Sequence, residues 1–220
     1  MTILLDLGAD VNVSCVYFGS PLQAASTTGK EDIMKLLLQR GAKVNPRGGE
    51  YGLAIAGAIR YGHEGATRLL LKHEAAIQTK LDSKYGSPLQ AASDLGNGEI
   101  VKMLLDKGAT VDQEGLEGNA LILASRSGHV AVVDMLLKKG TNVDREGAKG
   151  NALVLASRNG HVAIVKILID KGCRINTIEV GGMKWGTALQ AASAHGQEEV
   201  VKLLLKKWAV NQCGPKGNAS

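Results

Sequence analysis

The sequence predicts an all-α solenoid, in which pairs of short helices stack one after another and finger-like turns lie between them. Two short patterns that recur along the chain and a hydrophobic composition with few aromatic residues predict this fold class. Of the 220 residues, 45% are hydrophobic and only 3% are aromatic. A core of Leu, Ile, Val and Ala suits thin layers of short helices better than a single large globule.

The two patterns keep the same phase at intervals of roughly 33 residues, the length of a repeat in several helical solenoids. Leu-Leu-x-x-Gly-Ala-x-Val-Asn and its variants close each unit, and Gly-x-x-Leu-x-x-Ala (Ile for Leu once) opens it. The Gly position of the closing pattern is occupied by Gly8, Gly41, Glu74, Gly108, Gly140, Gly172 and Trp208. The opening pattern begins at Gly19, Gly52, Gly86, Gly118, Gly150 and Gly186.

Within one unit, the residues after Ser20 predict a short first helix. Ser20 can cap the helix, and Pro21 suits its first turn because the missing N–H of proline would be unpaired there. Leu22 and Ala25 share one face, which lets a neighbouring helix approach closely. Gly29 is expected to end this helix.

A second, amphipathic helix follows, because Ile33, Leu36 and Leu37 recur at helical spacing. Gly41 is expected to close it with a left-handed C-cap. Neither helix is long enough to be stable alone. Each pair must therefore bury its apolar face against the next pair, which defines a solenoid.

These units resemble ankyrin repeats, which open with Thr-Pro-Leu-His-x-Ala. The closest copies are two Ser-Pro-Leu-Gln segments that begin at Ser20 and Ser87, and the variant units resemble those of long fungal ankyrin arrays. The family's His position is occupied by Gln23, Gln90, Gln190, Ala56, Ile122 and Val154. The resemblance implies that Gln preserves the bonds which the family's His makes to the turn backbone.

The repeat phase divides the chain into three parts. Residues 1–18 are interpreted as a partial N-terminal repeat and finger, residues 19–211 as six ankyrin-like repeats, and residues 212–220 as the start of a truncated further repeat or a tail. We expect units cut from a longer array rather than a short natural chain with frayed ends. Glu74 occupies the Gly position of the closing pattern, where a left-handed cap then costs about 1 kcal/mol or more. Trp208 occupies the same position in the last repeat, and we expect the end of the stack near Trp208 to fray first.

No set of residues predicts catalysis, a cofactor or a metal site, so we expect the chain not to be an enzyme. The three cysteines are odd in number and lack ligand spacing, which favours the reducing cytoplasm or nucleus. No stretch has the roughly 18 uncharged apolar residues of a membrane helix. Three histidines follow a Gly between two helices and are interpreted as starting the second helix: His63, His129 and His161.

Aromatic residues gather in the expected fingers. They are Tyr17, Phe18, Tyr51, Tyr85 and Trp185, and Tyr61 ends a first helix. The resemblance implies that fingers and first helices line a groove for partners, and aromatic residues are frequent hot spots at interfaces. Most of these residues directly precede the Gly that opens a unit, and a fixed position also suits packing on the neighbouring finger. Both interpretations therefore stand.

Three arginines share one position after the Leu-x-x-Ala segment: Arg60, Arg126 and Arg158. With the finger residues Lys84 and Arg145, they predict a basic ladder along the groove. The candidate partner-binding residues are therefore Tyr51, Arg60, Tyr61, Lys84, Tyr85, Arg126, Arg145, Arg158 and Trp185. A protein partner with an acidic segment would fit such a ladder. An ordinary solvated face with small Arg–Glu pairs is the alternative.

These features together predict a non-catalytic protein–protein interaction scaffold that binds a protein partner through the groove. The alternative is a passive structural spacer within a larger multidomain protein. The net charge of +5 is spread over the second helices, whereas nucleic-acid binding calls for a clustered basic stripe. The sequence therefore does not favour nucleic acid as the partner.

Overall fold

A computed structural model describes residues 8–78, 86–175 and 186–212 of the chain. These residues form twelve α-helices and no β-strand, which confirms the all-α prediction. The chain divides into two compact units, Met1–Thr110 and Val111–Ser220. Each unit is built from helix pairs, and in each pair a first helix precedes a second helix.

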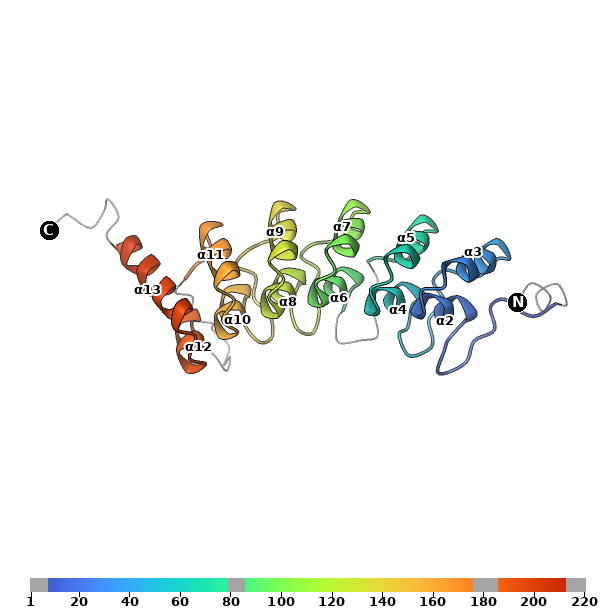
Figure 1. Cartoon of the computed structure of the whole chain (residues 1–220), viewed down its shortest axis with the longest axis horizontal. Helices are drawn as coiled ribbons and strands as arrows, with labels where there is room; N and C mark the ends of the chain where they lie inside the picture. Colours follow the sequence, from blue (N-terminus) through green and yellow to red (C-terminus); the bar gives the residue numbers. More distant parts are fainter. Residues whose placement is uncertain (1–7, 79–85, 176–185, 213–220) are drawn as a thin grey trace. The chain divides into compact units, whose positions relative to one another are not determined.

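Unit 1 contains three helix pairs (Figure 1). They are α2 (Pro21–Thr27) and α3 (Glu31–Gln39), α4 (Ala54–Arg60) and α5 (Glu64–Lys72), and α6 (Pro88–Leu95) and α7 (Gly98–Asp106). The first helices pack in the order α2, α4 and α6, and the second helices pack in the order α3, α5 and α7. The two kinds of helix therefore form two layers.

Unit 2 repeats this arrangement with three further pairs. They are α8 (Ala120–Ser127) and α9 (Val130–Lys138), α10 (Ala152–Arg158) and α11 (Val162–Asp170), and α12 (Ala188–Ala194) and α13 (Glu198–Gln212). Helix α10 packs between α8 and α12, and α11 packs between α9 and α13. The core is the apolar layer between the helices, and all residues from Ala152 to Ser157 of α10 are buried in it.

The first helices begin as the sequence predicts. Ser20 Oγ accepts a hydrogen bond from the backbone N–H of Gln23 (3.3 Å), and Gln23 Oε1 accepts one from the backbone N–H of Ser20 (2.6 Å). Gln23 Nε2 also donates to the carbonyls of Gly48 (2.7 Å) and Gly52 (2.8 Å) in the following turn. This confirms at Gln23 the bonding to turn backbone that the family resemblance implied.

The Asn that ends the closing pattern ties one repeat to the next. Asn45 Nδ2 donates to the carbonyl of Glu74 (3.0 Å), and Asn45 Oδ1 accepts from the backbone N–H of Ala76 (2.8 Å). Asn12 makes the same two bonds to Gly41 and Lys43. Both of these copies therefore fix the end of the following second helix.

The histidines stand at the starts of second helices, and their side chains contact the preceding helix pair. His63 and His161 are the N-cap residues of α5 and α11, and neither side chain caps its own helix. The Nε2 atom of His63 lies 3.1 Å from the carbonyl oxygen of Thr27 in α2, and that of His161 lies 3.0 Å from the carbonyl oxygen of Arg126 in α8. Helices α2 and α8 are the first helices of the preceding pairs. The histidines thus connect neighbouring pairs.

The predicted apolar face of α3 is only partly right. Met34 and Leu37 are fully buried, whereas Ile33 is 37% exposed. The corresponding Ile100 and Ile164 are fully buried, each in a second helix that packs against the second helix before it. Among the described residues, no helix precedes α3 in its layer, so Ile33 lacks that cover.

The ends of the second helices confirm the left-handed glycine caps. The last copy of the closing pattern, however, does not end its helix. Gly41 and Gly108 have φ of +84° and +81°, and Glu74 adopts φ of +60° at the same position. At Trp208 the helix does not close, because α13 continues to Gln212. A non-glycine residue adopts the left-handed conformation only at a cost, which favours continuation of the helix at this position.

Glu74 provides a test of how much its conformation costs. The change Glu74→Gly should raise the free energy of unfolding by about 1 kcal/mol, because Gly adopts positive φ without a Cβ clash. Urea denaturation followed by circular dichroism measures it. The reverse change Gly108→Glu is the control: its Cβ would meet no atom within 4 Å, so any loss of stability there is conformational. No gain from Glu74→Gly would contradict the strain assigned to this cap.

Candidate functional site

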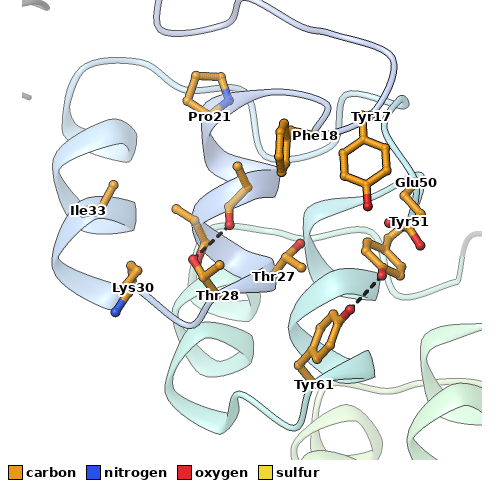
Figure 2. Close-up of a pocket in the computed structure, with 12 residues that line it drawn as sticks. Tyr17, Phe18, Pro21, Thr27, Thr28, Lys30, Ile33, Glu50, Tyr51 and Tyr61 are labelled. Atoms are coloured by element: carbon orange, nitrogen blue, oxygen red, sulfur yellow. Dashed lines mark hydrogen bonds between the residues drawn. The ribbon is translucent and has the colours of Figure 1, made fainter.

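Unit 1 contains a pocket of about 490 Å³ between two fingers and the first helices (Figure 2). We call residues 11–19 finger 1 and residues 43–52 finger 2. The pocket lining comes from both fingers, from α2, from the start of α3 and from Tyr61 after α4. Its aromatic end consists of Tyr17, Phe18, Glu50, Tyr51 and Tyr61.

Finger 1 presents its aromatic residues at a tight turn. The backbones of Cys15 and Gly19 exchange two hydrogen bonds, of 3.1 Å and 3.0 Å, and the intervening residues form the tip. Tyr17 is 65% exposed and Phe18 is 64% exposed. Their rings meet edge to face, with centroids 4.9 Å apart. The tip therefore carries a large apolar surface that the described chain leaves open to solvent.

The two fingers touch through their backbones. The backbone N–H of Glu50 donates to the carbonyl of Tyr17 (3.0 Å). Gly49 has φ of +67°, and a Cβ on it would lie 2.7 Å from the backbone nitrogen of Gly19. Only glycine fits this contact. The close approach places Tyr17 and Phe18 of finger 1 next to Glu50 and Tyr51 of finger 2.

Tyr51 and Tyr61 form the other side of the aromatic end. Their hydroxyl oxygens are 2.8 Å apart and their rings lie edge to face, with centroids separated by 5.8 Å. The hydrogen bond with Tyr61, then burial, then Glu50 raise the pKa of Tyr51 above its ordinary value, so Tyr51 stays a neutral phenol. Tyr61 also stacks on the ring of His63, which holds it from the other side.

Apart from Lys30, the remaining lining is aliphatic or has satisfied hydroxyls. Thr27 Oγ1 donates to the carbonyl of Gln23 (2.9 Å), and Thr28 Oγ1 donates to that of Ala24 (3.0 Å). Figure 2 shows Glu50 beside Tyr17 and Tyr51, with Lys30 on the far side of Thr28. The pocket thus has a carboxylate at its aromatic end and an ammonium group at its aliphatic end.

Three basic residues of unit 2, Arg126 at the end of α8 and Arg145 and Lys149 in the following finger, are paired with glutamates. Glu117 accepts from Lys149 Nζ (2.8 Å) and forms an ion pair with Arg126, and Arg145 pairs with Glu114. The hydrogen bonds from Lys149 and Arg126 lower the pKa of Glu117 from its ordinary 4.5 to about 2. This arrangement ties neighbouring fingers together and neutralises part of their positive charge.

The other predicted site residues lie in several places. Arg158 Nε donates to His195 Nε2 (3.2 Å), and Arg60 is exposed at the end of α4. Lys84, Tyr85 and Trp185 lie outside the described residues. Of the nine candidates, Tyr51 and Tyr61 line the pocket. The prediction that these candidates bind a partner stays a prediction.

Sequence reasoning did not include Tyr17, Phe18 or Glu50 among the site residues. Tyr17 and Phe18 belong to the finger aromatics, and the signal that could have selected them is the adjacency of two large rings in one turn. Glu50 had no such signal. Its place beside Tyr17 depends on the backbone bond between the fingers, which the sequence pattern does not encode.

In the described part of the chain, no group of three or more His, Cys, Asp or Glu side chains could hold a metal ion. Among the described helices, none combines the length and the apolar character that crossing a bilayer requires.

Helix pairs of this length, closed by left-handed glycines and separated by fingers, define a stacked helical-repeat protein. The family model for ankyrin repeats in three copies matches residues 50–115 and 121–214, and the single-repeat model matches residues 20–48. The chain therefore belongs to the ankyrin repeat family.

Solved structures agree with this assignment. The ankyrin repeat domain of human ASB11 is 26% identical, with a TM-score of 0.80, over 92% of this chain and 90% of that one. An ankyrin repeat domain from Acinetobacter baumannii is 30% identical, with a TM-score of 0.74, over 86% of this chain and 97% of that one. A search of curated protein sequences found no match.

The ion pairs of Glu117 predict a pH dependence of stability. Because the pKa is lowered on folding, the stabilisation is present above pH 4.5 and is lost as the pH falls towards 2. We expect the loss to be on the order of 1 kcal/mol, since partly exposed pairs are screened by solvent. Urea unfolding of the wild type and of Glu117→Gln at pH 6 and pH 3 measures it. Parallel losses in the two proteins would contradict the prediction.

Proposed function

We propose that the chain is a non-catalytic interaction module and that the aromatic pocket of unit 1 is its main contact with a protein partner. Ankyrin repeat domains are generally protein–protein interaction modules, which supports the coarse function. The finer proposal is that the partner binds the surface formed by the fingers and the first helices, as the family resemblance implies.

One observation carries the proposal: three large rings are left half or more exposed around a single pocket. Tyr17, Phe18 and Tyr61 are exposed by 65%, 64% and 53%. Aromatic side chains dominate interface energetics, and fully burying one large apolar side chain contributes about 1.5–3 kcal/mol. A partner that covers these rings would gain more from them than from the ion-paired fingers of unit 2.

An acidic partner segment at the arginines is the alternative within this function. Arg126 and Arg145 already have glutamate partners, so an incoming carboxylate would replace an existing ion pair. Such an exchange yields little net free energy at an exposed site. The paired state therefore supports unit 1 as the main contact and unit 2 as a secondary one.

The double variant Tyr17→Ala/Tyr61→Ala should weaken partner binding by tenfold or more, because each truncated hot-spot ring costs at least about 1 kcal/mol. A partner is first recovered by affinity purification with the wild-type chain, and its dissociation constant is then measured by titration calorimetry. Leu116→Ala, at an exposed finger residue of unit 2, is the matched control and should bind as the wild type does.

Further variants distinguish the other functions. If Arg126→Ala/Arg158→Ala abolishes binding and the tyrosine variant does not, the acidic-segment alternative is correct. A spacer would retain its partners in every variant. Affinity that falls steeply with salt, together with captured nucleic acid, would replace the protein partner with a nucleic acid.

A further inference from the structure

The aromatic end of the pocket has the geometry of an open cage. Tyr17 and Phe18 cross at 87°, and Tyr51 and Tyr61 cross at 84°. The two pairs come from adjacent fingers and from the end of α4, and the Glu50–Tyr17 backbone bond holds the fingers together. Perpendicular pairs present ring faces in several directions, and Figure 2 shows the four rings on the same side of the pocket as Glu50.

The charge at this end is negative. Glu50 is the one charged side chain of the aromatic end, and the other charged residue of the lining, Lys30, lies at the aliphatic end. The hydroxyls of Thr27 and Thr28 donate to backbone carbonyls. A ligand at the aromatic end therefore meets electron-rich ring faces and a carboxylate.

This combination selects among classes of ligand. A cation over the face of an aromatic ring is attracted by the ring quadrupole, and Glu50 adds a direct charge interaction. An anion would be repelled by both. A neutral apolar group would gain burial, but it would remove water from the Glu50 carboxylate without replacing its partners, which is costly.

We propose that the aromatic end of the pocket receives an alkylammonium side chain of the partner protein, namely a lysine, and that it binds N-methylated lysine most tightly. Methyl groups reduce the hydration that the ammonium must lose and add apolar contact with the rings. The volume of about 490 Å³ accommodates such a side chain together with adjoining backbone. This inference rests on the proposed function and names the partner chemistry that the same pocket recognises.

The test uses the whole 220-residue chain and a blocked trimethyllysine residue as the probe. A neutral isostere carries a tert-butyl group in place of the trimethylammonium group. Binding is measured by NMR titration, with the ring protons of the four aromatic residues as reporters. The charged probe should bind about tenfold more tightly than the neutral isostere, because cation–π attraction to several rings accumulates.

Substitutions then locate the binding. Tyr61→Leu places at this position the residue that the chain itself has at the corresponding Leu95 in α6, so the fold is retained while the ring is lost. We expect Tyr61→Leu and Tyr17→Ala each to weaken the charged probe about threefold to tenfold. Glu50→Gln should weaken it about threefold, and Glu146→Gln, at an exposed finger residue of unit 2, should have no effect.

Equal affinity for the charged probe and its isostere would overturn the cation proposal, and so would unchanged binding in Tyr61→Leu and Glu50→Gln. Neither result bears on whether a protein partner needs the pocket, which the tyrosine double variant tests separately. Circular dichroism and urea midpoints equal to those of the wild type verify that each variant is folded.

Discussion

Within each unit, the burial of one helix pair against the next is the constraint on which the other features depend. A first helix of seven or eight residues cannot persist alone in water. It becomes stable when neighbours cover its sides, as α4 is covered by α2 and α6. The polar side chains that recur at fixed positions serve the same end. Gln23, Asn45 and His63 all bond to the backbone of a neighbouring repeat within unit 1.

This constraint explains which parts of the fold could be predicted from the sequence. Helix starts at Ser20 and caps at Gly41 are decided by local backbone chemistry, so the sequence pattern identifies them. The exposure of Ile33 and the continuation of α13 past Trp208 were not predicted. The first depends on which helices lie beside α3. The second depends on the cost of a left-handed cap at a non-glycine residue, and a degraded pattern does not specify what replaces the cap.

The candidate site was predictable to a smaller extent. Tyr51 and Tyr61 could be selected from their repeat positions, because Tyr51 stands in a finger and Tyr61 at the end of a first helix. Glu50 could not, because its role depends on a contact between backbones of two turns. The arginine ladder shows the opposite difficulty. Arg126 was selected from its repeat position and Arg145 as a finger residue. The sequence left open whether such residues pair with glutamates, and the structure shows that these two do.

The contact between Gly49 and Gly19 has a consequence for how recognition can change. Because a backbone hydrogen bond and a close glycine contact join the two fingers, the gap between them does not require particular side chains at positions 17, 18 and 51. Positions 17, 18 and 51 can therefore be substituted while the frame that spaces them persists. New binding preferences can arise in this repeat by altering tips alone, at little cost to folding.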